Sequence, residues 1–335
     1  MGKLFVAMTS ALMLVSSVFA GARLYVSNER SGDVTVIDTS ENRVVATFPV
    51  GKRPRGIHVS NDGKRVYVAL SGTPISPPGK EKLDLPSDRK ADGIGVIDAV
   101  AGKLISMLPA GSDPEQFSLS KEEKLIYVSN EDANGVSIID IAGSKLIKTL
   151  PVGSEPEGVT TSPDGSLVFA TSETSNDLHV IDAASQSILA KIKMAQRPRS
   201  VGFTPDGAKA YVTCETAGVI GVVDVTSKRV VKQIKPPGEG VRPMGIAMAP
   251  DGKKVYVTTG RGGGVLVIDT SSDEVCGALQ DVGARPWGIC ITSDGRTLYT
   301  ANGPSNDVSV IDAADLKVIS RIPAGDSPWG LSLAP

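Results

Sequence analysis

The sequence predicts an all-β fold, a seven-bladed β-propeller, because one unit of about 42 residues recurs seven times after residue 22. The unit repeats an aromatic residue at Tyr25, Tyr67, Tyr127, Phe169, Tyr211, Tyr256 and Tyr299. It repeats an acidic residue at Asp38, Asp98, Asp140, Asp182, Asp224, Asp269 and Asp312. It repeats a proline at Pro54, Pro114, Pro156, Pro198, Pro243, Pro286 and Pro328. The three series stay in register, so the period does not depend on one residue type.

Each unit holds four short runs that predict four antiparallel strands. In the first pass these runs are 24–27, 34–38, 44–48 and 56–59, which are rich in β-branched residues and bounded by turn residues. Asp-Gly pairs at 62–63, 164–165, 206–207, 251–252 and 294–295 predict hairpins between an innermost strand and the next strand. The segment 121–124, KEEK, lacks this pair, and we expect a different turn there.

The chain ends predict how the ring closes. The repeats begin at the second strand of a blade, near residue 23, and end with an innermost strand near residues 328–333. We therefore expect the C-terminal strand to join the N-terminal blade. Such closure leaves no blade with an open inner edge.

The first 20 residues predict a signal peptide. Lys3 precedes the apolar run 4–18, and the small-residue pattern ending at Ala20 is typical of a cleavage site. An uncleaved anchor is the alternative, although the run is short for a membrane-spanning helix. We expect residues 21–335 to form a single propeller domain, exported to the periplasm as a monomer, without membrane insertion of the mature chain.

Composition excludes several classes of site. The formal net charge is −2, from 35 basic and 37 acidic residues, which gives no global attraction to nucleic acid or anionic membrane. Cys214, Cys276 and Cys290 are expected to be buried, unpaired thiols. No Cys/His cluster indicates zinc. Of the two histidines, His58 on an innermost strand is the one candidate haem ligand, and a packed structural role is the alternative.

Propeller connectivity sorts the loops into two faces. The proline loops that enter the innermost strands share one face, here the top face, with the loops that join the second and third strands. One insertion, residues 71–92, lengthens a top-face loop. Its four prolines and mixed charges indicate a surface loop rather than an extra domain.

The runs YVSNERSGDVTVIDTSENRVVATFPVGKRPRGI at 25–57 and IYVSNEDANGVSIIDIAGSKLIKTLPVGSEPEGV at 126–159 resemble YVTN-type β-propeller repeats. With its leader and early insertion, the chain resembles the exported β-propeller proteins associated with PQQ-dependent catabolism. The resemblance implies a periplasmic setting beside quinoprotein alcohol dehydrogenases and ABC-transport components, either of which could be the partner. It implies no reaction and supplies no catalytic residue.

The residues that flank the prolines polarise the top face. Before the prolines stand Arg53, Asp113, Glu155, Arg197, Arg242, Arg285 and Ser327, and after them Arg55, Glu115, Glu157, Arg199, Met244, Trp287 and Trp329. An acidic sector at 113–157 thus faces a basic sector at 197–285 that runs into both tryptophans of the chain.

A planar guanidinium and a stacking ring together suit a flat anionic ligand or an acidic partner surface. PQQ, an aromatic tricarboxylate, is a possible ligand. In the alternative interpretation the arginines pair with Glu29, Glu131, Glu173 and Glu215 from neighbouring loops, and the tryptophans pack between blades. The candidate binding residues are Arg53, Arg55, Arg197, Arg199, Arg242, Arg285, Trp287, Trp329, Glu173 and Glu215.

The leading hypothesis is a non-catalytic binding or accessory protein, with no catalytic or metal-ligating residue assigned. One alternative is a metal-dependent hydrolase of the propeller lactonase type, for which Asn28, Asn130 and Asn302 lie in or beside top-face loops. Another is binding of single-stranded nucleic acid by the Arg and Trp sector, which the net charge disfavours.

Overall fold

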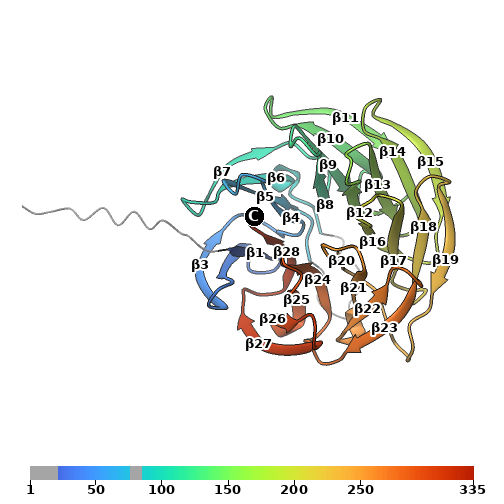
Figure 1. The fold of residues 1–335 in the computed structure, drawn as a ribbon. Coiled ribbons are helices and arrows are strands. Elements are labelled where there is room, and N and C mark those ends of the chain that lie inside the picture. The colour runs from blue at the N-terminus through green and yellow to red at the C-terminus, as the bar shows by residue number, and fades with distance from the viewer. Residues whose placement is uncertain (1–21, 76–84) are drawn as a thin grey trace, which may run out of the picture.

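In a computed structural model of the 335-residue chain, residues 22–75 and 85–335 are described. The predicted signal peptide and the middle of the insertion therefore lie outside the described residues. Seven four-stranded antiparallel sheets are arranged as blades around a common centre (Figure 1), which confirms the predicted fold class.

The blades are numbered in chain order, with their strands given from the centre outward. Blade 1 holds β28 (Pro328–Leu333), β1 (Arg23–Asn28), β2 (Asp33–Asp38) and β3 (Arg43–Pro49). Blade 2 holds β4 (Ile57–Val59), β5 (Arg65–Leu70), β6 (Gly93–Asp98) and β7 (Lys103–Leu108). Blade 3 holds β8 (Pro114–Leu119), β9 (Leu125–Asn130), β10 (Gly135–Asp140) and β11 (Lys145–Pro151). Blade 4 holds β12 (Pro156–Thr161), β13 (Leu167–Ser172), β14 (Asp177–Asp182) and β15 (Ser187–Lys193).

The other three blades repeat this order. Blade 5 holds β16 (Pro198–Phe203), β17 (Lys209–Cys214), β18 (Val219–Asp224) and β19 (Arg229–Ile234). Blade 6 holds β20 (Ile246–Met248), β21 (Lys254–Thr258), β22 (Val265–Asp269) and β23 (Glu274–Leu279). Blade 7 holds β24 (Pro286–Ile291), β25 (Thr297–Asn302), β26 (Asp307–Asp312) and β27 (Lys317–Pro323). Three 3-10 turns interrupt top-face loops, η1 (Arg89–Ala91), η2 (Gly260–Gly262) and η3 (Gly303–Ser305).

The C-terminal strand closes the ring, as the sequence predicts. β28 pairs antiparallel with β1, with Leu24 opposite Leu333 and Val26 opposite Leu331. Beyond the strand, the Ala334 N–H donates to the Arg23 carbonyl at 2.7 Å. Blade 1 is therefore built from both chain ends, and its inner edge is covered.

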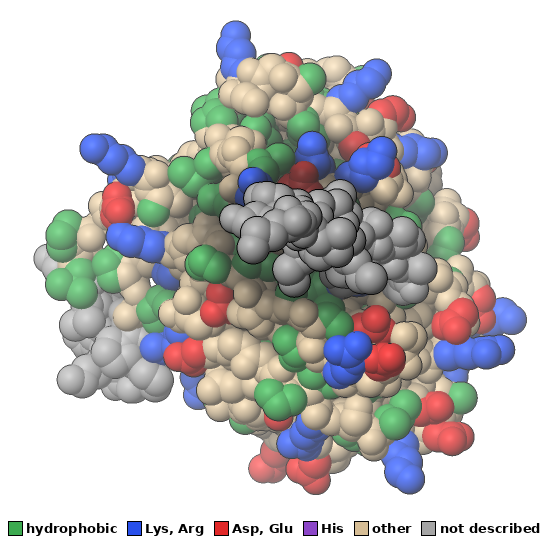
Figure 2. Space-filling view, turned by 90° about the vertical axis from the view of Figure 1, so that its left-hand side faces the viewer, with side chains coloured by type: hydrophobic (Ala, Val, Ile, Leu, Met, Phe, Trp, Pro, Cys, Tyr) green, Lys and Arg blue, Asp and Glu red, His purple; other side chains and the backbone are tan. Residues whose placement is uncertain are grey.

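The repeated aromatic residues form the core between blades. All seven are between 0% and 6% exposed, which explains why an aromatic residue recurs at this position. The rings of Phe169 and Phe203 lie 4.7 Å apart between blades 4 and 5. The outer strands carry smaller exposed apolar groups such as Leu104 and Ile105, and Figure 2 shows apolar side chains on one side of the molecule interspersed with charged ones.

The turns confirm most of the predicted turn chemistry. In each Asp-Gly turn the Asp carboxylate accepts the N–H two residues later, as Lys64 donates to Asp62 at 2.9 Å. The expectation for 121–124 was wrong. Glu123 takes the glycine position with φ 51°, and its N–H reaches the Ser120 carbonyl at 2.8 Å, as Gly63 reaches Ser60. Adjacent turn contacts therefore hold a non-glycine residue in the left-handed region.

The cysteine prediction was right that the three thiols are unpaired but wrong about the burial of two of them. All three are free thiols, but only Cys214 is buried, while Cys290 is half-buried and Cys276 is exposed on the outer strand β23. Side chains alternate between the two faces of a strand, and on β23 the side chain of Cys276 lies on the face exposed to solvent. Within residues 22–75 and 85–335, no helix is long and apolar enough to cross a membrane.

Candidate functional site

Backbone geometry brings the loop glutamates beside the residues that precede the prolines. Six of these seven residues, all but Arg242, have φ between 44° and 62°. The carbonyls of four of them, Asp113, Glu155, Arg197 and Ser327, accept from the loop that joins the second and third strands of their own blade. Thus Glu131 N–H donates to Asp113, and Glu173 N–H donates to Glu155. The arginines and glutamates of neighbouring loops consequently lie within ion-pairing reach.

Buried hydroxyl groups fix the residues that follow the prolines. A Ser or Thr on the second strand of one blade donates to the backbone carbonyl of that residue in the next blade. The donor and acceptor pairs are Ser27 and Arg55, Ser129 and Glu157, Thr171 and Arg199, Thr213 and Met244, and Thr258 and Trp287. The top-face side chains therefore start from backbone positions that hydrogen bonds hold in place.

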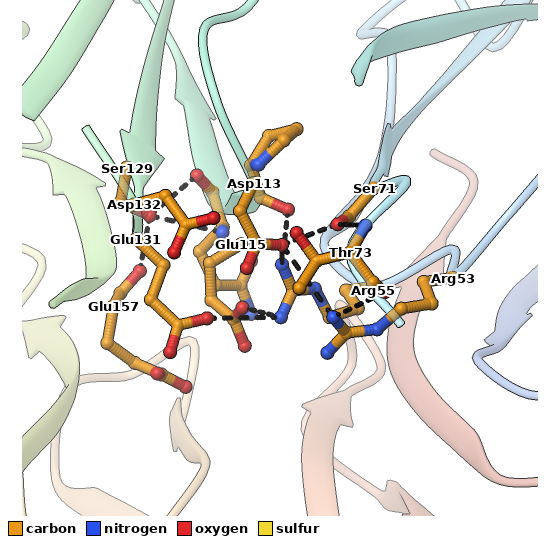
Figure 3. A network of polar contacts seen from close by, with 12 residues as sticks. Arg53, Arg55, Ser71, Thr73, Asp113, Glu115, Ser129, Glu131, Asp132 and Glu157 are labelled. Atoms are coloured by element: carbon orange, nitrogen blue, oxygen red, sulfur yellow. Dashed lines mark hydrogen bonds and ion pairs between the residues drawn. The ribbon is translucent and has the colours of Figure 1, made fainter. Parts of the chain in front are cut away.

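Arg55 is the centre of the first charged network (Figure 3), and its side chain is 2% exposed. Its Nη2 lies 2.6 Å from Asp113 Oδ1, and its Nη1 pairs with Glu115 and lies 3.7 Å from Glu131. Arg53 pairs with Glu29 at 3.0 Å beside it. Arg53 and Arg55 thus pair with carboxylates of the protein itself, as the alternative interpretation of the sequence expects.

Asp113, Glu115 and Glu131 form a group that could hold a metal ion by ligand spacing alone, with atoms within 4.8 Å of one another. Arg55 pairs with all three, so its guanidinium supplies the positive charge there. Burial raises the pKa of Asp113, but Arg55, the Ser71 hydroxyl and Arg53 together outweigh burial and hold this pKa below its usual value. Burial raises the pKa of Glu131 to about 7, with Arg55 opposing.

Arg199 is the centre of the second network and is 5% exposed. It pairs with Glu157 at 2.6 Å, Glu173 at 2.7 Å and Glu215 at 2.9 Å. Arg197, with a side chain 44% exposed, pairs with Glu173 at 2.9 Å and Glu215 at 3.1 Å. Glu173 and Glu215, two of the candidate binding residues, are therefore engaged with arginines of the protein itself.

Burial, followed by the Glu157 carboxylate, raises the pKa of Glu173 to about 8, against the opposing Arg199 and Arg197. Burial also raises the pKa of Glu215, but Arg199 and Arg197 outweigh it and leave that pKa below its usual value. Two carboxylates on the same arginines thus have pKa values shifted in opposite directions.

The tryptophans form a stacked pair at the other side of Arg199. The rings of Trp287 and Trp329 lie 5.8 Å apart at 30°. The guanidinium of Arg285 lies 4.5 Å from the Trp287 ring centre and that of Arg199 lies 5.6 Å from it. These distances place both arginines in cation–π range. Trp329 is buried and Trp287 half-buried, so packing accounts for part of their role.

Arg285 differs from Arg53, Arg55, Arg197 and Arg199 because it has no carboxylate partner among the described residues. Among the described residues, neither Arg285 nor Arg242 forms an ion pair. Burial lowers the pKa of Arg285 below its usual value, with Glu215 opposing and Arg261 adding to the decrease. Nor does either indole N–H donate to another part of the described chain, whereas buried tryptophans usually find an acceptor.

A cavity of about 380 Å³ opens beside this pair, lined among others by Arg30, Arg285, Trp287, Trp329 and Asp326. The mouth of the central channel is much smaller, about 40 Å³. The innermost strands approach each other closely here, since a Cβ atom at Gly158 would lie 2.0 Å from the Arg199 carbonyl oxygen of the next blade. A ligand of aromatic size therefore fits on the top face and not in the channel.

Arg30 is the site residue that the sequence analysis missed. It lies in the loop after β1, lines the cavity and has no ion pair within the described part of the chain. The signal was present in the repeats, because the matching positions after Glu131, Glu173 and Glu215 are Asp132, Thr174 and Thr216. Comparison of this loop position across the seven blades would have shown two basic residues, Arg30 and Arg261.

The asparagines and His58 do not gather around a funnel. Asn28, Asn130 and Asn302 are fully buried, and each donates within its own blade, to Thr35, Ser137 and Ser309 respectively. His58 is exposed on β4 with its Nδ1 3.0 Å from the Val59 carbonyl. The described ends of the insertion meet the top face, where the Asp92 carboxylate accepts from Gly72 and Asp113.

Glu173 should make stability depend on pH. Its folded-state pKa of about 8 lies above the ordinary 4.5, so the folded chain keeps a proton that the unfolded chain releases. This contribution is fully present below about pH 4.5 and is lost as the pH rises through about 8. We expect the melting temperature to fall by several degrees from pH 6 to pH 9.

The Glu173→Gln variant should flatten this pH profile, and Glu274→Gln, on the outer strand β23, should keep it. Calorimetry at pH 6, 7, 8 and 9 measures it. A wild-type melting temperature that is constant across the range contradicts the assignment of a held proton.

A family model of YNCE-like β-propellers matches residues 77–165 and 161–334. Among solved structures, hydrazine synthase of Kuenenia stuttgartiensis is 21% identical with TM-score 0.71, over 83% of this chain and 89% of that chain. A candidate 6-phosphogluconolactonase from Bacteroides uniformis is 17% identical with TM-score 0.75, over 93% and 99%. The dihydro-heme d1 dehydrogenase NirN is 17% identical with TM-score 0.64, over 92% and 74%. Such identities show a shared fold. No curated protein matches this sequence significantly.

Proposed function

Because the chain belongs to the YNCE-like β-propeller family, whose fold presents loops on a rigid ring, we propose that it is a non-catalytic binding protein. Its ligand is a flat anionic molecule held on the top face at Trp287, Trp329 and Arg285. The protein is exported and serves PQQ-dependent alcohol oxidation beside a quinoprotein dehydrogenase or ABC-transport component. PQQ is the ligand that fits this chemistry and this setting.

The observation that carries the proposal is Arg285, which lies on the face of Trp287 and forms no ion pair with any residue that the structure describes. Arg53, Arg55, Arg197 and Arg199 are neutralised by glutamates and aspartates of the protein. Arg285 instead stands among other arginines, and burial disfavours its charge. A ligand carboxylate would relieve both effects, because a charge-assisted hydrogen bond forms where no internal partner competes.

The cavity offers further groups of the same kind. Arg30 adds a second guanidinium without an ion pair in the described chain, and the indole N–H groups add two donors without acceptors there. Of the two carboxylates in the lining, Glu29 pairs with Arg53, which leaves Asp326 against Arg30 and Arg285, so the net charge of the lining favours an anion. The set suits a planar molecule with several acceptors.

The lactonase alternative receives less support from the contacts. It needs oxygen ligands directed at a cation, but Arg55 pairs with Asp113, Glu115 and Glu131. Asn28 and Asn302 donate to side chains of their own blades. The binding role therefore accounts for the available groups better than metal-assisted hydrolysis does.

Tryptophan fluorescence tests the proposal directly, because both tryptophans of the chain lie in this site. We expect PQQ to quench the emission saturably. Arg285→Gln should weaken binding about tenfold or more, the equivalent of about 1.5 kcal/mol for one charge-assisted hydrogen bond. Arg296→Gln, an exposed arginine beside Asp294, is the matched control and should bind as the wild type does.

Calorimetric titration provides a check free of optical interference. Absence of binding to wild type at millimolar PQQ would exclude the small-molecule proposal. Equal affinity of wild type and Arg285→Gln would show that the ligand lies elsewhere. Tight, strongly salt-dependent binding of an oligothymidylate instead of PQQ would favour the nucleic-acid alternative.

A further inference from the structure

The network around Arg199 contains more carboxylates than arginines. Glu157, Glu173 and Glu215 are each 7% exposed and all pair with Arg199. Arg197 is the only other guanidinium in ion-pairing distance of Glu173 and Glu215 within the described chain. Two positive charges cannot neutralise three buried negative charges, so the arrangement favours retention of one proton.

Glu173 is the residue placed to hold that proton. Charged side chains from four neighbouring loops surround it, namely Glu131, Glu155, Glu157, Arg197, Arg199 and Glu215. The Glu155 carboxylate accepts from the Thr174 hydroxyl, next to Glu173. Burial and Glu157 raise the pKa of Glu173 to about 8, whereas the pKa of Glu215 is lowered.

Arg199 connects this carboxyl group to the tryptophan site. Its Nη1 lies 2.7 Å from Glu173, and its guanidinium carbon lies 5.6 Å from the centre of the Trp287 ring. Glu215 pairs with Arg199 and also acts on the charge of Arg285. A change of one charge at Glu173 therefore acts directly on Arg199, which lies over Trp287, and Arg199 in turn acts on the charge of Arg285.

We propose that proton binding at Glu173 regulates the charge state, and through it the anion affinity, of the tryptophan site. With the proton present, Arg197 and Arg199 balance Glu157 and Glu215. Without the proton, the network gains one negative charge beside Arg199, and this charge weakens the binding of an anionic ligand at Trp287 and Arg285. The ligand part of this inference rests on the proposed function.

Thermodynamic linkage between proton binding and ligand binding sets the size of the pH effect and requires that ligand binding also changes proton binding. Coupling between two sites commonly changes an affinity by about 5-fold to 150-fold. We expect PQQ affinity to fall at least about 5-fold between pH 6.5 and pH 9. By the same linkage, binding near pH 8 should take up a fraction of a proton, which titrations in two buffers of different ionisation heat measure.

The experiment has two arms, each with Glu173→Gln and the control Glu274→Gln. The first arm follows tryptophan emission of the free protein from pH 6 to pH 9.5. We expect one transition with its midpoint between pH 7 and pH 9, present in wild type and Glu274→Gln and absent in Glu173→Gln. The second arm measures PQQ affinity at pH 6.5 and pH 9, where Glu173→Gln should lose the pH dependence.

The arms separate the possible failures. A free protein without the transition, or with the same transition in Glu173→Gln, overturns the inference whatever binds. If the transition depends on Glu173 but the PQQ affinity is equal at both pH values, the proposal that Glu173 regulates binding is refuted. A transition that depends on Glu173 without any PQQ binding supports proton control of the site and contradicts the proposed ligand. Melting curves of the variants confirm that each is folded.

Discussion

Deletion of Ser327–Pro335 is expected to abolish the stable ring. The deletion removes β28, so β1 loses the partner of Leu24 and Val26 and blade 1 keeps three strands. It also removes Trp329 from its packing against Trp287. Loss of one innermost strand affects every blade through closure, and the total stability of a domain is only about 5–15 kcal/mol. We expect insoluble protein or a melting temperature lower by more than about 10 °C.

Deletion of Pro335 alone is the matched control, since this residue is exposed and follows the last strand. It should leave the melting temperature unchanged. A soluble Ser327–Pro335 deletion that melts like the wild type would mean that another segment closes the ring.

Arg199→Met should be the most destabilising single substitution on the top face. It leaves Glu157, Glu173 and Glu215 buried without their shared cation. Removal of one partner of a buried ion pair costs about 3–5 kcal/mol. The loss should be smaller at pH 6 than at pH 9, because protonation of Glu173 relieves part of the repulsion.

Arg197→Gln is the control within the same network. The Arg197 side chain is 44% exposed, and such pairs contribute about 0–1 kcal/mol. Urea unfolding of both variants at pH 6 and pH 9 measures the difference. Equal free energies of unfolding for Arg199→Met and wild type would show that the buried network does not stabilise the fold.

The sequence predicted the strand order and the closure because a propeller repeat fixes both. Once the aromatic series was aligned, the chain ends had to share a blade, and β28 pairs with β1 as that alignment requires. The turn at Ser120 was missed because its residues lack the Asp-Gly pair, yet local hydrogen bonds hold Glu123 at φ 51°. Turn shape followed the surrounding strands rather than the residue preference.

The sequence predicted which charged residues lie near one another on the top face, but not which arginine pairs with which carboxylate. Arg55 reaches forward to Asp113 and Glu115 of blade 3, whereas Arg199 reaches back to Glu157 of blade 4. The two arginines therefore enclose the acidic sector from both sides. The direction each side chain takes depends on its rotamer and on local crowding, which a repeat alignment does not specify.

The unpaired state of Arg285 could have been derived from the repeats. Arg53 and Arg197 pair with Glu29 and Glu173 of the preceding blade. The residue that the alignment places at this position before Arg285 is Gly260, which has no side chain that could pair with an arginine. Comparing residues pairwise across blades, rather than series by series, would have singled out Arg285.

A crystal structure of the protein grown with saturating PQQ tests the central claim most directly. The account predicts a planar ligand against the Trp287 and Trp329 pair, in the cavity of about 380 Å³, with a carboxylate about 3 Å from the Arg285 guanidinium. A ligand bound at another place, or an empty cavity at saturating PQQ, would contradict it.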